Sequence, residues 1–196
     1  MFTGIICDTG LFKGYRLGKR EMAVEAPSIS SQLKVGESLA VNGVCLSLIR
    51  KEKNILVFNL SQATIQVTNL GSLRQGERLN LELPLTLSAP LGGHLVSGHA
   101  DGKGKILKIT QRKNGKRITV SFPSILRPYF IPKGSVALNG VSLTVAELHS
   151  SSFEVELIPI TLENSNLGQL RTGDTVNIEC DLIGKYVYNW IKTARR

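Results

Sequence analysis

The chain has 196 residues, of which 42% are hydrophobic and 20% are charged, values that are ordinary for a globular protein with a buried core. Its net charge of +9 comes from scattered basic residues that do not alternate with aromatic ones, which argues against a nucleic-acid-binding surface. No apolar run approaches the ~20 residues of a membrane-spanning helix, and no basic region leads an apolar stretch at the N-terminus, so we expect a cytoplasmic protein that does not contact a membrane.

Strand-like runs rich in Val, Ile and Leu occur along the chain, separated by Gly, Asn and Ser turns. They cover residues 38–49, 55–60 and 78–83 in the first half, and residues 135–146, 153–158 and 175–178 in the second. Prolines and glycines in residues 84–93 break any regular element and predict a domain boundary. Within the longest runs, Asn42-Gly43 and Asn139-Gly140 permit a positive φ or a close backbone approach.

The densest basic group surrounds Asn114-Gly115, which is a strong signal for a two-residue hairpin turn. The four basic residues that flank this pair are Arg112, Lys113, Lys116 and Arg117. We therefore expect these four side chains to be exposed to solvent around a β-turn.

The C-terminal residues carry a helical pattern. Apolar residues recur at i, i+3, i+4 and i+7, namely Val187, Trp190, Ile191 and Ala194. A helix this short is marginal alone, so its apolar stripe is expected to dock on its own barrel or on a neighbouring subunit. Three basic residues close the chain, where cations suit the C-terminal end of a helix: Lys192, Arg195 and Arg196.

The cysteines and histidines do not form a metal-binding pattern. Cys7, Cys45 and Cys180 are widely spaced and include no CxxC pair, and the three histidines do not stand at zinc-ligand spacings from them. Free thiols in a reducing cytosol are the simplest interpretation, and no metal site is expected.

The two halves of the chain repeat each other. Residues 38–47 align with residues 135–144 at an offset of 97 with six identities in ten pairs, and the same offset aligns residues 64–83 with residues 161–180 with nine identities in twenty. Random pairing would give about one identity. Residues 3–10 also resemble residues 97–104 weakly, at an offset of 94. This duplication predicts two similar antiparallel barrels, which remove exposed strand edges by closing.

The repeated segments resemble those of the riboflavin synthase family. They are MFTGI at residues 1–5, NGVCL at 42–46, TNLG at 68–71, GGHLVSGH at 92–99, GVSLTV at 140–145 and SNLG at 165–168. The resemblance covers about residues 1–186, with every motif in order. It implies an all-β fold of two tandem six-stranded Greek-key barrels, at residues 1–88 and 89–184, followed by a short C-terminal α-helix at residues 185–196.

The resemblance also implies the reaction and the assembly. In this family two molecules of 6,7-dimethyl-8-ribityllumazine exchange a four-carbon unit to give riboflavin and 5-amino-6-(D-ribitylamino)uracil, without a bound cofactor. The family implies a homotrimer in which substrate lies between the N-terminal barrel of one subunit and the C-terminal barrel of its neighbour. The resemblance also suggests lumazine synthase as a partner protein. The alternative is a non-catalytic lumazine- or flavin-binding antenna protein of the same fold, although the retained polar segments favour the enzyme.

Six residues match catalytic positions of this family: Phe2, Cys45, His99, Ser142, Thr144 and Asp181. The match places His99 near the lumazine C7 methyl group, where a neutral imidazole can act as a base near pH 7. Cys45 and Ser142 are repeat partners that could add to C7 or hydrogen-bond the ring, and a buried cysteine of the core is the alternative for Cys45. Phe2 would pack against the heterocycle unless it lies in its own barrel. The counterpart of Asp181 is Pro84, so the two half-sites are expected to be chemically unequal.

The family match extends to a larger substrate-binding set. It contains Gly4, Ile5, Ile6, Cys45, Leu46, Ser47, Asn59, Ser61, Gln62, Thr64, Gly98, His99, Ala100, Lys133, Ser142, Leu143, Thr144, Ile158 and Thr161. Thr144 follows Ser142 by two residues, so both side chains should face one side of a strand. His94 should point away from His99 on a strand and is interpreted as structural, as is His149 in a polar turn. Two departures, Ala63 and Ile160, put polar contacts to the ribityl chain in doubt.

Overall fold

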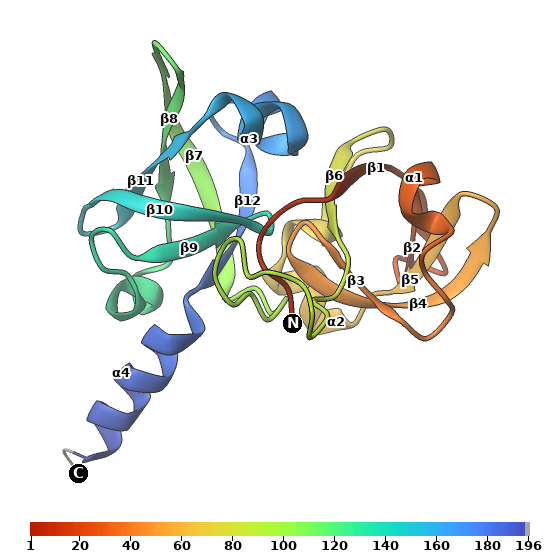
Figure 1. The fold of residues 1–196 in the computed structure, drawn as a ribbon, viewed down its shortest axis with the longest axis horizontal. Coiled ribbons are helices and arrows are strands. Elements are labelled where there is room, and N and C mark those ends of the chain that lie inside the picture. The colour runs from red at the N-terminus through yellow and green to blue at the C-terminus, as the bar shows by residue number, and fades with distance from the viewer. Residues whose placement is uncertain (195–196) are drawn as a thin grey trace.

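The structure is a computed structural model that describes residues 1–194 as two closed six-stranded barrels followed by a projecting helix (Figure 1). Arg195 and Arg196 of the predicted basic C-terminal group lie outside the described residues. The predicted all-β architecture of two tandem barrels with a C-terminal helix is confirmed. The boundaries at residues 88/89 and 184/185 stay predictions.

The N-terminal barrel consists of antiparallel strands in the closed order β1-β2-β5-β4-β3-β6. They are β1 (Asp8–Arg16), β2 (Glu21–Glu25), β3 (Ser38–Val41), β4 (Val44–Glu52), β5 (Ile55–Asn59) and β6 (Arg78–Glu82). Short helical segments connect them: α1 (Pro27–Ser30), α2 (Gln62–Val67) and the 3-10 turn η1 (Asn69–Gly71). Apolar side chains from all six strands fill the interior.

The C-terminal barrel repeats this circuit in the order β7-β8-β11-β10-β9-β12. Its strands are β7 (Gly102–Arg112), β8 (Gly115–Ser121), β9 (Ser135–Leu138), β10 (Val141–Leu148), β11 (Ser152–Leu157) and β12 (Thr175–Cys180). Its helical segments are η2 (Ser124–Tyr129), α3 (Pro159–Asn164) and η3 (Asn166–Gln169). The predicted strand-like runs did not include the first two strands of each barrel, because glycines, charged residues and, in β1 and β7, a β-bulge interrupt their alternation. In the C-terminal barrel the predicted hairpin at Asn114-Gly115 nevertheless indicated the pair β7 and β8.

The two Asn-Gly pairs form hairpin turns, so each predicted long run is in fact two strands. Asn42 and Gly43 have φ of 47° and 74°, and Asn139 and Gly140 have φ of 45° and 81°, which is the left-handed geometry of a tight hairpin. The close backbone approach occurs as well, because a Cβ on Gly43 would lie 2.5 Å from the Gly140 nitrogen. The two turns therefore pack against each other where the barrels meet.

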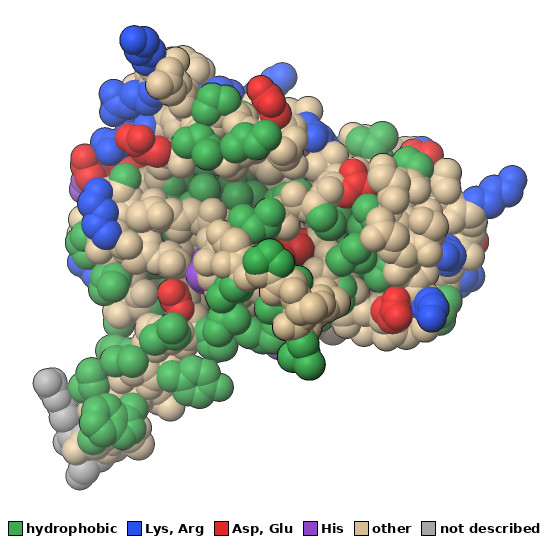
Figure 2. Space-filling model, viewed as in Figure 1, with side chains coloured by type: hydrophobic (Ala, Val, Ile, Leu, Met, Phe, Trp, Pro, Cys, Tyr) green, Lys and Arg blue, Asp and Glu red, His purple; other side chains and the backbone are tan. Residues whose placement is uncertain are grey.

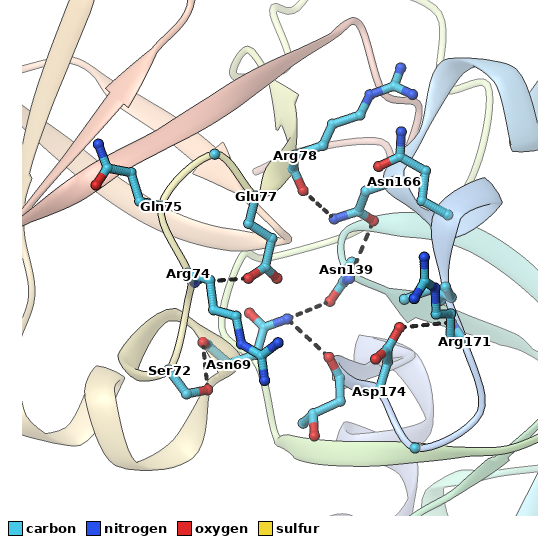
Figure 3. A pocket seen from close by; sticks show the side chains of 15 residues that line it. Asn69, Ser72, Arg74, Gln75, Glu77, Arg78, Asn139, Asn166, Arg171 and Asp174 are labelled. Atoms are coloured by element: carbon cyan, nitrogen blue, oxygen red, sulfur yellow. Dashed lines mark hydrogen bonds between the residues drawn. The ribbon is translucent and has the colours of Figure 1, made fainter.

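Six buried asparagines join the barrels around these turns, and Figure 3 shows three of them, Asn69, Asn139 and Asn166. They form three repeat pairs at the offset of 97: Asn42 with Asn139, Asn69 with Asn166, and Asn80 with Asn177. The Asn80 amide nitrogen donates to the Asn139 carbonyl at 2.9 Å, and the Asn177 amide nitrogen donates to the Asn42 carbonyl at 2.9 Å. Because the bonds recur with the halves exchanged, the joint has an internal pseudo-twofold arrangement.

Helix α4 (Leu182–Ala194) begins three residues before the predicted helix and projects away from both barrels (Figure 1). No residue of the described helix is buried, and the side chains of Val187 and Trp190 are 50% and 72% exposed. Figure 2 shows hydrophobic side chains gathered along it. Its fixed contacts are at its base, where Lys185 pairs with Asp101 at 2.7 Å and Tyr188 packs on Tyr129. The predicted apolar stripe is therefore uncovered in the single chain.

Among the described residues, no helix combines the length and the apolar character needed to cross a lipid bilayer.

Candidate active site

An open cleft of about 620 Å³ lies on the outer face of the C-terminal barrel. Seven predicted substrate-binding residues line it: Ile5, Lys133, Ser142, Leu143, Thr144, Ile158 and Thr161. Six residues outside the predicted set complete the lining: Gly92, Gly93, Arg117, Ser135, Ala146 and Glu156. The fold thus brings together predicted residues that are more than 150 positions apart in the sequence.

Strand alternation along β10 places the polar residues in this cleft. Val141, Leu143 and Val145 are buried in the barrel core, whereas Ser142 and Thr144 between them point outward. The predicted common face of Ser142 and Thr144 is therefore confirmed. The Leu143 side chain belongs to the core, so this residue can offer a ligand mainly its backbone, and Leu46 in the N-terminal barrel is placed in the same way.

Ser142 is in contact with a histidine that the sequence interpretation left outside the site. His94 Nδ1 lies 2.7 Å from Ser142 Oγ, within hydrogen-bonding distance. The segment around His94 is not a strand, apart from the single bridge between Val96 and Phe2, so the argument from opposite strand faces does not apply. The strand-face argument that separated His94 from the site is therefore wrong, and the contact with Ser142 is compatible with a structural role for this histidine.

The electrostatics of His94 follow from its burial. Burial lowers the pKa of its imidazole below the ordinary value, and the nearby Asp181 carboxylate opposes this shift to a smaller extent. The Nε2 atom is buried and has no hydrogen-bond partner among the described residues. His94 is therefore neutral at neutral pH.

Two extended segments hold the backbone around the outward residues. They are residues 2–6 at the N-terminus and residues 96–100 before β7, and we call them straps. The Gly4 carbonyl accepts a hydrogen bond from the Ser142 nitrogen at 2.8 Å, and the Gly98 carbonyl accepts one from the Cys45 nitrogen at 2.8 Å. Both glycines have a positive φ, 76° and 84°, and a Cβ at either would lie 2.6 Å from the Cβ of the residue it faces. Only glycine allows this approach.

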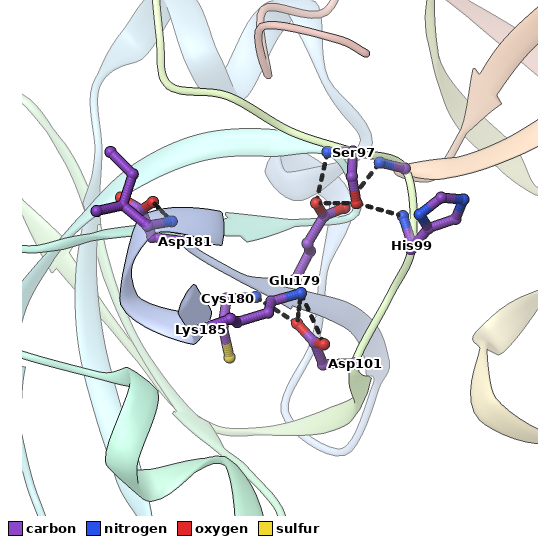
Figure 4. Close-up of polar contacts among 9 residues, drawn as sticks. Ser97, His99, Asp101, Glu179, Cys180, Asp181 and Lys185 are labelled. Carbon is purple, nitrogen blue, oxygen red and sulfur yellow. Dashed lines mark hydrogen bonds and ion pairs between the residues drawn. The ribbon is translucent and has the colours of Figure 1, made fainter. Parts of the chain in front are cut away.

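Each strap holds the outward strand of one barrel and is anchored by a buried glutamate of the opposite barrel. Glu82 of β6 accepts hydrogen bonds from the Thr3 nitrogen at 2.6 Å, the Thr3 hydroxyl at 2.7 Å and the Gly4 nitrogen at 3.1 Å. Glu179 of β12 repeats this with the Ser97 nitrogen, the Ser97 hydroxyl and the Gly98 nitrogen at 2.6, 2.7 and 3.0 Å (Figure 4). Each strap therefore links the two barrels.

Burial raises the pKa of both the Glu82 and the Glu179 carboxyl, and the hydrogen bonds from the straps act in the opposite direction. With three donors aimed at each carboxylate, we assign the ionised form to both, because such donors stabilise the charge. Sequence reasoning missed this pair. The available signal was the identity of Glu82 and Glu179 at the offset of 97 within buried strands.

The N-terminal barrel carries the corresponding half-site on β4, where Cys45 and Ser47 point outward. At the neighbouring α2, Ser61 caps the helix by accepting from the Thr64 nitrogen at 3.0 Å, and its hydroxyl lies 2.8 Å from that of Thr64. Asn59 and Gln62 are exposed beside them. The predicted residues of this half-site are thus outward on β4 or lie on and beside α2.

Phe2 lies between the barrels and is completely buried. Its ring clusters with Ala40, Val96 and Ala137, and Cys45 packs against this cluster. In this arrangement the ring supports Cys45 from behind and has no face open to a ligand. Neither of the two sequence expectations, an own-barrel core or direct stacking on a heterocycle, describes this position.

His99 and Asp181 do not join the C-terminal cleft. The His99 side chain is exposed at the end of the strap, and its backbone nitrogen donates to the Ser97 hydroxyl at 3.2 Å. Asp181 lies at the start of α4 and accepts from the Ile183 nitrogen at 2.9 Å. In the view of Figure 4 the two residues lie on opposite sides of Glu179. Within the described residues, no hydrogen bond joins His99 to Ser142 or to Asp181.

The remaining strap residues pack across the molecule. Ile6 contacts the core of the C-terminal barrel, and Ala100 contacts the core of the N-terminal barrel. They are the repeat partners of one another at the offset of 94. Both predicted residues therefore fix the straps, and their side chains point away from the cleft into the cores.

Arg117 has a different role from the solvated turn residue that was predicted. The hairpin exists, with its turn at Lys113 and Asn114, but the Arg117 side chain is only 21% exposed and lines the cleft. It forms ion pairs with Glu147, Glu154 and Glu156 at 3.0, 3.2 and 3.1 Å. Arg117 and Glu156 therefore bring a charged pair into the wall of the cleft.

Glu147 and Glu154 also form, with His149, a group whose potential metal ligands lie within 4.8 Å of one another. The Arg117 guanidinium already provides the positive charge for both carboxylates, so this cluster is explained without a metal ion.

A second cleft of about 650 Å³ lies over the asparagine joint and contains none of the predicted site residues (Figure 3). It is lined by turn residues of both halves, including the repeat partners Arg74 and Arg171. The predicted site residues that line a cleft all belong to the other one, where the outward residues of β10 meet the N-terminal segment.

Comparisons with known proteins identify the family of the chain. The family model of the lumazine binding domain matches the chain twice, at residues 3–84 and 97–181. Riboflavin synthase of Bacillus subtilis (strain 168) is 35% identical over 196 residues, which cover 99% of this chain and 91% of that protein. Riboflavin synthase of Schizosaccharomyces pombe is 33% identical over 210 residues, with both chains covered completely.

Solved structures of LumP have the same fold. The complex of LumP with riboflavin aligns with a TM-score of 0.86 and 24% identity, and covers 92% of this chain and 99% of LumP. The complex of LumP with 6,7-dimethyl-8-(1'-D-ribityl) lumazine aligns with a TM-score of 0.82 and 24% identity, over 91% and 98% of the two chains.

Proposed function

The chain belongs to the lumazine-binding-domain family, and from this premise we propose that it is a riboflavin synthase. The reaction converts two molecules of 6,7-dimethyl-8-ribityllumazine into riboflavin and 5-amino-6-(D-ribitylamino)uracil. The observation that carries the proposal is that one chain builds the same strapped, outward-facing half-site twice, once around Cys45 and once around Ser142. A dismutation needs two copies of one substrate, and two related half-sites provide them.

The C-terminal cleft suits a flat heterocycle with a polyol chain. Ser135, Ser142 and Thr144 offer hydroxyl groups for the polar edge of the ring, and Lys133 adds a cation. Arg117 and Glu156 add charged groups that can hydrogen-bond the ribityl hydroxyls, although Ile160 is apolar. We assign the N-terminal half-site to the second lumazine, with Cys45, Ser47, Ser61 and Thr64 as its polar contacts.

The catalytic assignments follow the two half-sites. His99 accepts a proton from the C7 methyl group of one lumazine, while Cys45 and Ser142 bind or add to the rings. Holding both reactants in opposed orientation removes most of the entropic barrier of a bimolecular step. Asp181 acts on the C-terminal half-site through its field at His94. These roles are part of the proposal.

We propose a homotrimer in which the N-terminal half-site of one subunit faces the C-terminal cleft of its neighbour. The uncovered apolar face of α4 supports this, because hydrophobic surface of this kind is normally buried in an assembly. Sedimentation of the wild type and of a Trp190→Lys variant tests it, since the charged residue should dissociate the particle. The cytoplasmic location and an association with lumazine synthase stay predictions.

The test of the activity is direct. The purified chain is mixed with 6,7-dimethyl-8-ribityllumazine, and the appearance of riboflavin is followed by absorbance. Production of riboflavin with multiple turnovers is expected. Tight fluorescent binding of lumazine without product would instead favour the antenna function, which the likeness to LumP makes the specific alternative.

A further inference from the structure

The two half-sites differ at one contact that the duplication does not explain. His94 Nδ1 lies 2.7 Å from Ser142 Oγ, whereas the Cys45 thiol has no hydrogen bond to a side chain among the described residues. The histidine therefore makes the C-terminal half-site chemically distinct.

The surroundings of His94 decide which nitrogen carries its proton. Nε2 is buried without a partner, and a buried N–H left without an acceptor costs more than an acceptor left without a donor. A neutral ring in this position therefore keeps its proton on Nδ1, where the Ser142 oxygen can accept it. The low proton affinity that burial gives this ring excludes the doubly protonated form at neutral pH.

The Ser142 hydroxyl can then donate its proton only toward the cleft. Its oxygen accepts from His94 Nδ1, so its own hydroxyl proton is free and lies at the cleft that Ser142 lines. The main-chain nitrogen of Ser142 is already held by the Gly4 carbonyl, so the residue cannot turn away. A hydroxyl polarised in this way donates more strongly than an isolated one.

We propose that His94 is a positioning residue that fixes Ser142 as a hydrogen-bond donor, so that the C-terminal cleft selects an acceptor atom, a carbonyl oxygen or an unprotonated ring nitrogen, on its ligand. This deepens the proposed function and rests on it for the identity of that ligand. The Cys45 half-site offers only a weak thiol donor at the equivalent point. The hydrogen bond from Ser142 therefore withdraws electron density from the ring bound at the C-terminal barrel. The ring bound at the N-terminal barrel gives up its C7 proton without such a hydrogen bond.

The first test uses no substrate. In a chain labelled with ¹⁵N-histidine, the two ring nitrogens of His94 report the tautomer by their chemical shifts at neutral pH. Protonation at Nδ1 is expected, and Ser142→Ala should move the Nδ1 resonance. A proton on Nε2, or a positively charged ring, would overturn the proposal whether or not the chain makes riboflavin.

The second test is a double-mutant cycle on lumazine. His94→Ala and Ser142→Ala should each weaken 6,7-dimethyl-8-ribityllumazine binding about tenfold, and the double variant should be no worse than Ser142→Ala alone. His94→Asn should recover much of the loss, because its amide nitrogen can donate from nearly the same place as Nδ1. Cys45→Ala should instead add independently to His94→Ala. Additive losses for His94 and Ser142, or no recovery with asparagine, would contradict the positioning role.

The cycle separates this inference from the proposed function. Binding is read from lumazine fluorescence, and turnover is read from riboflavin absorbance. If the wild type binds lumazine without turnover, the enzyme assignment fails while coupling between His94 and Ser142 still supports the inference. If turnover occurs but the two substitutions do not couple, the enzyme assignment stands and the inference fails.

Discussion

The two half-sites of this chain share their supports and differ in what they present to a ligand. In both, a strap glycine carbonyl holds the outward strand, a buried glutamate holds the strap, and asparagines hold the barrels together. The presented groups differ, with Cys45 in one half-site and Ser142 with its His94 in the other. The supporting glycines, glutamates and asparagines are identical in the two halves, whereas the outward residues Cys45 and Ser142 differ.

The neighbouring helices show the same contrast. The N-terminal half-site has a hydroxyl pair, Ser61 and Thr64, where the C-terminal half-site has the exposed Ile158 beside Thr161. Conversely, Arg117 and Glu156 line the C-terminal cleft, and their counterparts by strand pairing are Glu21 and Asn59. Identical substrates bound to these two surfaces would meet different polar groups. This inequality is what a reaction with a donor and an acceptor requires.

The largest expected effect is on turnover. His99→Ala should reduce the rate of riboflavin formation at least about 100-fold, because it removes the proposed general base. His149→Ala is the matched control, since that histidine is also exposed and lies outside both half-sites. Near-normal turnover of His99→Ala would reject the role of His99 as the base.

The symmetry of the joint can be tested by stability. Asn80→Ala and Asn177→Ala should each lower the free energy of unfolding by about 2–4 kcal/mol, since each leaves buried backbone groups unpaired. Urea denaturation measures this, with the exposed Asn164→Ala as control. Equal losses are expected, and a large loss in only one variant would show that the two halves of the joint are not energetically equivalent.

The straps predict a crossed effect. Glu179→Gln loosens the strap that holds Cys45, so alkylation of the Cys45 thiol should become about tenfold faster, as expected for losing roughly 1–2 kcal/mol of hydrogen bonding. Glu82→Gln acts on the strap at Ser142, which is joined to the other strap by the backbone hydrogen bonds between Phe2 and Val96, so a smaller acceleration is expected at Cys45. Peptide mapping by mass spectrometry separates Cys45 from the exposed Cys7. Equal acceleration in both variants would contradict the assignment of Glu179 as the main anchor of the strap at Cys45.

A smaller, severalfold effect is expected at Cys45 itself. If its role is to hydrogen-bond the ring, Cys45→Ser should keep more riboflavin-forming activity than Cys45→Ala. The reverse order would indicate that Cys45 serves mainly to pack against the buried Phe2 cluster. Steady-state kinetics of the two variants distinguish these roles.

The smallest effect concerns pH. Burial lowers the pKa of His94 in the folded chain, so as pH falls below the ordinary value of about 6.5 the unfolded chain takes up a proton that the folded chain does not. The contribution of neutral His94 to the free energy of unfolding is complete above that pH and is lost as the pH falls. His94→Asn should therefore lose less stability than the wild type between pH 7.5 and pH 5, by up to about 1.4 kcal/mol per unit. Urea midpoints that fall in parallel for both proteins would contradict this.

The sequence by itself determined the duplication, the closed barrels and the common face of Ser142 and Thr144. These features depend on local hydrophobic alternation and on a repeat register, both of which are visible along the chain. The apolar stripe of the terminal helix was visible in the same way, because residues three and four apart share a helix face.

Only the tertiary structure decided what surrounds the reactive residues. Thr3 meets Glu82, His94 meets Ser142, and Asn80 meets Asn139 across separations of 79, 48 and 59 residues. Such pairs are set by barrel closure and by the crossing of the straps, which no local pattern encodes. The same crossing buried Phe2 behind Cys45 and left His99 exposed, since the strap and not a strand positions both. The repeat hinted at Glu82 and Glu179 through their identity, but their partners emerged only when the two barrels were packed together.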